Sequence, residues 1–190
     1  IQHWEEKTLL DRKPWLEKLN NRIFELDTRV KKVAITQGDG TSDILFFNLE
    51  GNIFSDCIPM AMLSATCVME NENGRREQAS SSRSFHIGYE FLNEKLIEEL
   101  AQEVVSRTAI LFEAIKPKGG EMPVVMGAGG SGILLHEAIG HAFEADFNRL
   151  GTSIFSDKLG KKICNPLINV IDDGTIPHNR GSINFDDEGI

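Results

Sequence analysis

Three features that define whole classes of protein are missing from this sequence of 190 residues. No apolar run approaches the roughly 18 residues that a membrane-spanning helix needs. The three cysteines, Cys57, Cys67 and Cys164, form no CxxC pair, which argues against a disulfide framework and against a zinc ribbon. Lys and Arg number 20 against 29 Asp and Glu, and the net charge of −9 repels a phosphate backbone. We therefore expect a protein of the reducing cytoplasm that binds neither a membrane nor nucleic acid.

Features of a natural terminus are also missing at both ends. The sequence begins at Ile1 without methionine and without the apolar core of a signal peptide, and it stops abruptly after Asp187-Glu188-Gly189-Ile190. Its apolar fraction of 41% and charged fraction of 26% are those of an ordinary globular protein. We therefore expect a segment of a longer protein, with parts of any site lying outside these residues.

Residues 1–116 alternate between helical and extended periodicity. The two segments in which apolar residues recur at helical spacing are 14–26 and 93–116. The extended segments, separated by turn-forming residues at 38–40 and 50–52, are 30–36, 44–48 and 53–69. The polar stretch 71–84 is expected to form a hairpin or an exposed loop. The pattern predicts an α+β fold, with antiparallel sheet segments and flanking helices.

The composition changes near residues 116–122, from a charged helix to a glycine-rich, apolar segment. We therefore expect one domain over residues 1–116 and the start of a second, truncated domain over residues 117–190. In the second domain, a strand at 123–126 and a glycine turn at 127–132 precede a helix from 133 to about 147. A further strand is expected at 167–171. This strand, turn and helix carry the residues with the clearest chemistry.

That helix contains His136-Glu137-Ala138-Ile139-Gly140-His141, which reads HExxxH. The motif is one residue longer than HExxH, in which two histidines one turn apart bind a single zinc ion. In a regular α-helix, residues five apart lie roughly 140° apart around the axis, so the two imidazoles diverge. A π-turn absorbs one residue and returns the pair to one face. We therefore predict an irregular backbone between Glu137 and His141, permitted by Gly140.

With zinc bound, His136 and His141 would be ligands and Glu137 the general base that takes a proton from the attacking water. Catalytic zinc usually has three protein ligands. The candidates for the third ligand, none with decisive spacing, are Glu144, Asp146, Cys164 and His178. A helix with two structural histidines and a surface glutamate is the alternative. Apolar neighbours such as Leu134, Leu135 and Phe143 predict that the helix is buried, and burying these polar groups without a metal is costly.

The glycines Gly127, Gly129 and Gly132 spell GxGxxG, the fingerprint of a dinucleotide-binding turn. The acidic residue expected roughly 20 residues further along, at the end of the next strand, is missing. A tight turn is therefore favoured, with the amides of Gly129 and Gly130 available to a substrate carbonyl. The acidic pairs Asp172-Asp173 and Asp186-Asp187 are better explained as turns than as Mg²⁺ or Ca²⁺ sites. Cys57 and Cys67 are expected to be core side chains.

Three stretches resemble the TldD-like proteins of the TldD/PmbA family, known earlier as modulators of DNA gyrase. The run HEAIGHAFEADFNRLGTSIFS is similar to the family signature HEAxGHxLExDFxxxGxSxF. The runs GEMPVVMGAGGSGILLHE and VIDDGTIPHNRGSINFDDEG resemble the segments on either side of it. Ala142 and Ala145 stand where the family often has glycine.

The resemblance implies a metallopeptidase in which His136 and His141 bind zinc, Glu137 acts as base, and a cysteine beyond residue 190 is the third ligand. It also implies a complex with a TldE/PmbA-like subunit or a second copy, and unfolded peptide substrates such as leader peptides and antitoxins. We therefore expect a zinc-dependent peptidase, whose metal site this segment alone does not complete. The alternatives are a nucleotide-binding oxidoreductase that uses the glycine turn, and a non-catalytic scaffold subunit of a protease complex.

Overall fold

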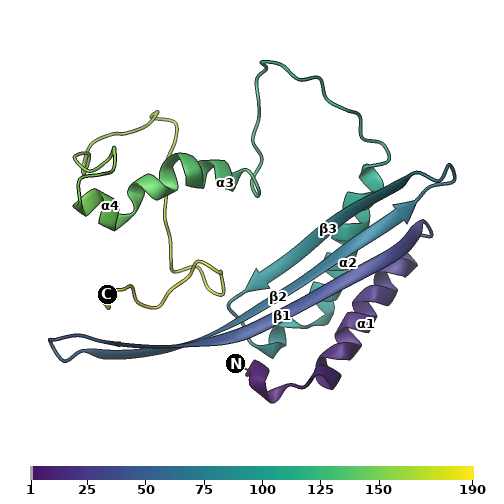
Figure 1. The fold of residues 1–190 in the computed structure, drawn as a ribbon, viewed down its shortest axis with the longest axis horizontal. Coiled ribbons are helices and arrows are strands. Elements are labelled where there is room, and N and C mark those ends of the chain that lie inside the picture. The colour runs from purple at the N-terminus through teal and green to yellow at the C-terminus, as the bar shows by residue number, and fades with distance from the viewer. Residues whose placement is uncertain (1) are drawn as a thin grey trace. The chain divides into compact units, whose positions relative to one another are not determined.

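The structure is a computed structural model that describes residues 2–190 (Figure 1). Its chain forms two compact units. The larger unit contains the residues up to Lys116 together with Asp173–Ile190, and the smaller unit is Pro117–Asp172. Asp173–Ile190 thus packs with the N-terminal residues in the larger unit. The change in composition near residue 116 instead predicts that this segment belongs with the rest of residues 117–190.

The larger unit contains a three-stranded antiparallel sheet. Its strand order is β1 (Val30–Phe47), β2 (Ile53–Glu70) and β3 (Arg76–Phe85). Strands β1 and β2 pair from Phe47 opposite Ile53 to Val30 opposite Met69. Strand β3 pairs only with Ala61–Glu70, so β1 and β2 continue beyond it as a two-stranded arm (Figure 1). The predicted antiparallel pairing of the sheet segments is confirmed.

The turn predicted at residues 38–40 is wrong, because β1 runs straight through it. Gly38 pairs with Met62 and Gly40 with Met60, and neither glycine has a positive φ. The carboxylate of Asp39, which would cap a turn, instead accepts from the Arg12 guanidinium and from Gln37 Nε2. Pairing with β2 along the whole strand thus overrides the local turn chemistry.

The other two connections form as predicted. Gly51 has a φ of 86°, and Asn48 Oδ1 accepts from the amides of Glu50 and Asn52 at 3.1 and 3.0 Å. This Asx arrangement closes the turn at residues 50–52. A similar turn around Asn71 leads into β3, so the polar stretch 71–84 is a hairpin.

Two helices cover one face of the sheet (Figure 1). Helix α1 (Leu9–Leu26) begins with a capping box between Thr8 and Asp11, earlier than the predicted start, and Pro14 lies inside it. Helix α2 (Glu94–Ile110) begins after Asn93, whose side chain accepts from the Leu96 amide at 3.0 Å, and it ends before the predicted residue 116. The expected α+β architecture is therefore confirmed.

The core lies between these helices and alternate residues of β2. Its fully buried members include Leu19, Ile23, Leu63, Met69, Leu100 and Val104. Cys67 belongs to it as predicted, and burial raises the pKa of its thiol. Cys57 was also expected in the core, but it is exposed because it lies on the part of β2 that extends beyond β3. No described helix of the chain has the length and apolar character needed to cross a membrane.

The smaller unit is built on a short, irregular helical segment. It consists of α3 (Gly132–Leu135), a π-helix over His136–Gly140, a 3-10 turn over His141–Phe143, and α4 (Ala145–Arg149). The strands predicted at residues 123–126 and 167–171 are wrong, since both segments are irregular. Neither has a strand partner within residues 2–190, and an unpaired strand leaves its backbone groups to water. The helix predicted from 133 to about 147 is confirmed, with its break.

Candidate metal centre

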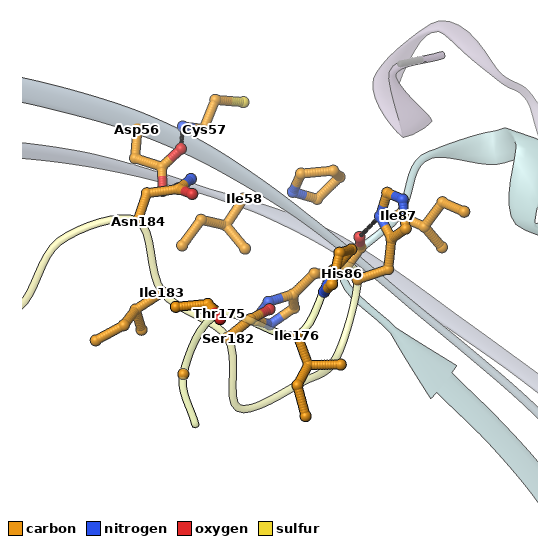
Figure 2. Close-up of a pocket in the computed structure, with 14 residues that line it drawn as sticks. Asp56, Cys57, Ile58, His86, Ile87, Thr175, Ile176, Ser182, Ile183 and Asn184 are labelled. Carbon is orange, nitrogen blue, oxygen red and sulfur yellow. Dashed lines mark hydrogen bonds between the residues drawn. The ribbon is translucent and has the colours of Figure 1, made fainter. Parts of the chain in front are cut away.

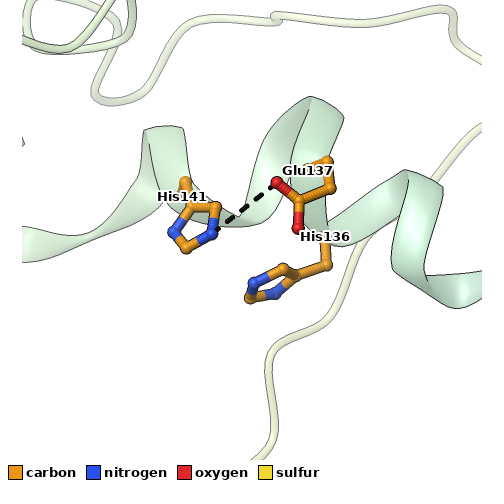
Figure 3. Close-up of side chains that lie close together, drawn as sticks. All are labelled: His136, Glu137 and His141. Carbon is orange, nitrogen blue, oxygen red and sulfur yellow. Dashed lines mark ion pairs between the residues drawn. The ribbon is translucent and has the colours of Figure 1, made fainter.

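The break in helical winding lies at the motif. The amide of His141 donates to the carbonyl of His136, five residues earlier, which defines a π-turn. The predicted irregular backbone between Glu137 and His141 is therefore confirmed. The extra residue is absorbed within one turn, and the two histidines stand on the same side of the helix (Figure 3).

The three polar side chains of the motif converge (Figure 3). The rings of His136 and His141 have centroids 4.3 Å apart at an interplanar angle of 65°. His141 Nε2 lies 3.9 Å from Glu137 Oε2. One ligand atom from each of the three residues lies within 4.8 Å of the others, and among residues 2–190 they form the one such cluster. The structure thus brings together the three residues that the sequence singled out.

The two imidazoles suit zinc, which binds histidine nitrogen at roughly 2.0–2.1 Å. Two ligand atoms of a tetrahedral zinc ion lie roughly 3.3–3.6 Å apart, and the ligand atoms of this cluster lie within 4.8 Å of one another, which is close to that spacing. The side chains of His141 and Glu137 are 52% and 62% exposed. An ion held here would be open to water and to a substrate.

The predicted burial of this helix is wrong for this chain. Leu134, Leu135 and Phe143 are 60%, 46% and 43% exposed. A domain of roughly 60 residues buries only about 60% of the surface that its unfolded chain exposes, so a unit as small as Pro117–Asp172 leaves much apolar surface in contact with water. Because the helix is exposed, the cost of burying polar groups gives no argument for a metal. The argument for a metal is that the side chains of His136, Glu137 and His141 converge.

Glu144 contacts the opposite edge of the His141 ring. His141 Nδ1 donates to Glu144 Oε1 at 2.5 Å. This hydrogen bond raises the pKa of His141 above its ordinary value, and the negative charges of Glu144 and Glu137 act in the same direction. The sequence offered Glu144 as a third ligand, but its carboxylate binds a histidine instead. The spacing of three residues between His141 and Glu144 is the signal that predicts this pair.

Gly140 has ordinary helical angles of φ −54° and ψ −55°, so the π-turn does not require its conformational freedom. Its lack of a side chain matters more. A Cβ at this position would lie 3.1 Å from Nδ1 and 3.5 Å from Cγ of His136. The ring of His136 lies in the space that a side chain at position 140 would otherwise fill.

Gly140→Ala should therefore displace the His136 ring by a few tenths of an ångström and strain its side-chain torsion angles. A displacement of this kind costs about 0.5–1.5 kcal/mol, which corresponds to roughly 2- to 10-fold weaker zinc binding. Competition against a chromogenic chelator measures this change. Gly132→Ala is the matched control, because a Cβ there meets nothing within 4 Å. Equal affinities of the two variants would show that Gly140 has no such role.

None of the other candidates for a third ligand joins the cluster. Cys164 is exposed and its Sγ lies 3.6 Å from the carbonyl of Ile168. His178 belongs to the larger unit, where its Nδ1 lies 3.1 Å from the carbonyl of His86. Asp146 is likewise not part of the cluster among residues 2–190. The cluster thus has two histidines and a glutamate.

The glycine turn before the helix is closed by its own backbone. The amide of Gly132 donates to the carbonyl of Gly129 at 2.8 Å, and Gly129 has a φ of 116°. The strand that a dinucleotide-binding turn follows is missing at residues 123–126, and α3 has only 4 residues. The geometry of a tight turn is therefore favoured over a nucleotide site.

The segment Asp173–Ile190 forms a separate pocket with the sheet of the larger unit. The residues that line it include Thr175 and Ser182 of this segment, His86, and Asp56 and Ile58 of β2 (Figure 2). The cavity has a volume of about 470 Å³. The acidic pairs form turns, as predicted: Asp173 Oδ1 accepts from the Thr175 amide at 2.9 Å, and Asp186 Oδ1 accepts from the Ile190 amide at 2.9 Å. These carboxylates are thus engaged within their own turns.

Comparisons with known proteins agree on one family. Residues 2–112 match the model of the PmbA/TldA metallopeptidase central domain, and residues 119–190 match that of the C-terminal domain. A metalloprotease TldD homolog of Haemophilus influenzae is 37% identical over 169 residues, which cover 86% of this chain and 35% of the relative. A TldD homolog of Buchnera aphidicola subsp. Acyrthosiphon pisum is 39% identical over 181 residues, covering 92% of this chain and 37% of the relative.

More distant relatives include a metalloprotease of Methanocaldococcus jannaschii, 32% identical over 86% of this chain and 36% of its own length. A solved structure from Thermotoga maritima, described as a modulator of a DNA gyrase, superposes with a TM-score of 0.78. It covers 100% of this chain and 43% of the other at 20% identity, so it supports the fold alone. This chain spans a little over a third of the length of its curated relatives. The chain belongs to the PmbA/TldA metallopeptidase family, with residues 2–112 matching its central domain and residues 119–190, which contain HExxxH in this sequence, matching its C-terminal domain.

Proposed function

We propose that this chain is the metal-bearing segment of a zinc-dependent peptidase. The observation that supports this most is the π-turn, which places His136 and His141 on one side of the helix with Glu137 beside them. Two imidazoles and a carboxylate at a distorted helix suit metal-assisted hydrolysis better than any other chemistry. Membership in a metallopeptidase family agrees with this assignment.

In this proposal His136 and His141 hold the ion, and a cysteine beyond residue 190 completes the protein ligands. Zinc, when bound, acts as a Lewis acid and makes water a stronger nucleophile. Glu137 accepts the proton that the attacking water loses as its oxygen bonds to the peptide carbon. The same carboxylate then returns the proton to the leaving nitrogen as the C–N bond breaks. The exposed position of Glu137 leaves it accessible to a peptide.

We propose further that the substrate is an unfolded or extended peptide, of the leader-peptide or antitoxin type. The open setting of the three side chains supports a long, flexible substrate better than a small buried one. The turn at Gly129 and Gly130 directly precedes the metal helix, and it would bind a substrate carbonyl. The working protein would be a cytoplasmic complex with a TldE/PmbA-like subunit or with a second copy.

Chelation tests the proposal. We expect 1,10-phenanthroline to abolish cleavage of an unstructured peptide by the product of the complete gene, assayed with its second subunit. Stoichiometric zinc added back should restore cleavage, because the chelator removes a group that the reaction needs. Cleavage that persists after zinc loss is verified by atomic absorption would contradict the proposal. A zinc-independent contribution to a partner's activity would instead support a scaffold role.

A further inference from the structure

The contact between His141 and Glu144 suggests how this histidine is prepared for a metal. We infer that Glu144 is a positioning residue, which fixes the tautomer and the orientation of the His141 ring. The inference rests on the proposed zinc site and adds a residue to it. Glu144 would not touch the ion itself.

The protonation of the ring follows from the chemistry of the two partners. An ionised carboxylate can only accept a hydrogen bond, so the hydrogen between Glu144 Oε1 and His141 Nδ1 must reside on the nitrogen. In a neutral imidazole the other nitrogen, Nε2, then carries the lone pair. Nε2 is the atom that lies 3.9 Å from Glu137 Oε2, on the side of the cluster. The ring therefore presents its lone pair toward the place where an ion would be held.

Metal-binding histidines commonly donate their second ring nitrogen to a carboxylate or a carbonyl, which fixes the ring and makes it a stronger ligand. His141 has such an anchor in Glu144. The ring of His136 packs edge-on against the ring of His141. The contact with Glu144 therefore bears on the positions of both rings, because the His136 ring lies against the ring that Glu144 holds.

The backbone around Glu144 is itself braced. Glu144 leaves the helical conformation, with φ −53° and ψ 131°, and it occupies the N-cap position of α4 without a capping hydrogen bond from its side chain. Asn148 Nδ2 donates to the carbonyls of Glu144 and Ala142, both at 2.9 Å. Ser153 Oγ donates to the same Ala142 carbonyl at 2.6 Å. Two side chains from further along the chain therefore hold the turn that places Glu144 against the ring.

A role as the third ligand, which the sequence left open for Glu144, fits the geometry less well. Its carboxylate lies against Nδ1, and the cluster of ligand atoms comprises His136, Glu137 and His141 without it. Asp146, two residues further along, carries the same charge but is not part of that contact or cluster. Asp146→Asn is therefore a matched control: it removes one negative charge near the site and leaves the contact between Glu144 and His141 in place.

Histidine tautomers test the inference without a metal. We would label the zinc-free product of the complete gene with ¹⁵N in histidine and record long-range ¹H–¹⁵N spectra above pH 8. His141, identified by its loss in His141→Ala, should show the Nδ1–H tautomer. Glu144→Ala should shift it to the Nε2–H form that free imidazole side chains favour, and Asp146→Asn should leave it unchanged. A wild-type His141 in the Nε2–H form would overturn the inference.

Zinc affinity, measured by competition, provides the second readout. Glu144→Ala should weaken binding roughly 10- to 100-fold, the usual effect of losing such a partner. Glu144→Gln, which keeps the shape but not the charge, should fall between Glu144→Ala and the wild type, and it serves if the alanine variant fails to fold. Unchanged affinity in both variants would overturn the inference. A wild-type protein that binds no zinc would instead overturn the proposed function, and the tautomer would still report on Glu144.

Discussion

Glu137→Gln should lower the rate of peptide cleavage by about 10²- to 10⁴-fold while zinc stays bound, because general acid–base catalysis contributes a factor of that size. The substituted amide keeps the shape of the side chain but cannot accept a proton. Glu137 Oε2 lies 3.9 Å from His141 Nε2, so it is near enough to the ligands to act on the same water. The measurement is kcat/KM on an unstructured peptide, with the zinc content of each sample determined in parallel.

Two outcomes would contradict this role. If cleavage by Glu137→Gln were within about threefold of the wild type, Glu137 would not be the base, whatever the metal does. If activity and zinc disappeared together, Glu137 would be a ligand and not a base. Glu121→Gln is a suitable control, because this glutamate is exposed in the same unit and is not part of the cluster.

His136→Ala and His141→Ala should each weaken zinc binding on the order of 100-fold. Zinc sites with four ligands bind with about 10–16 kcal/mol, so one lost ligand removes roughly 3 kcal/mol. Metal content after gel filtration and competition titration would measure the loss. His3→Ala is the control, since His3 is an exposed histidine of the larger unit. Stoichiometric zinc retained by His136→Ala would remove that residue from the site.

The metal motif could be predicted from the sequence because its geometry is local. Two histidines five residues apart cannot meet on a regular helix, so convergence requires one extra residue per turn. The structure places that π-turn at His136–Gly140. The role of Gly140 could not be predicted from the sequence. The space that this glycine leaves for the His136 ring depends on the rotamer of the histidine, which only the structure gives. The contact of Glu144 with His141 also depends on side-chain rotamers, so it too was found only in the structure.

The errors in the fold arise where distant parts of the chain decide the outcome. Residues 38–40 have the composition of a turn, but pairing with β2 keeps them extended. Residues 123–126 and 167–171 have the composition of strands but no partner among the described residues. Cys57 alternates like a core residue, yet it lies on the arm beyond β3. Local pattern thus predicted the type of most elements, and tertiary contacts set their limits.

Anomalous diffraction at the zinc edge, from crystals of the zinc-loaded product of the complete gene, tests the central claim most directly. We expect one strong peak between the rings of His136 and His141, within roughly 2.2 Å of a nitrogen of each, with the π-turn between them. An unbroken α-helix with the two rings on opposite faces, and no anomalous peak beside either, would contradict it.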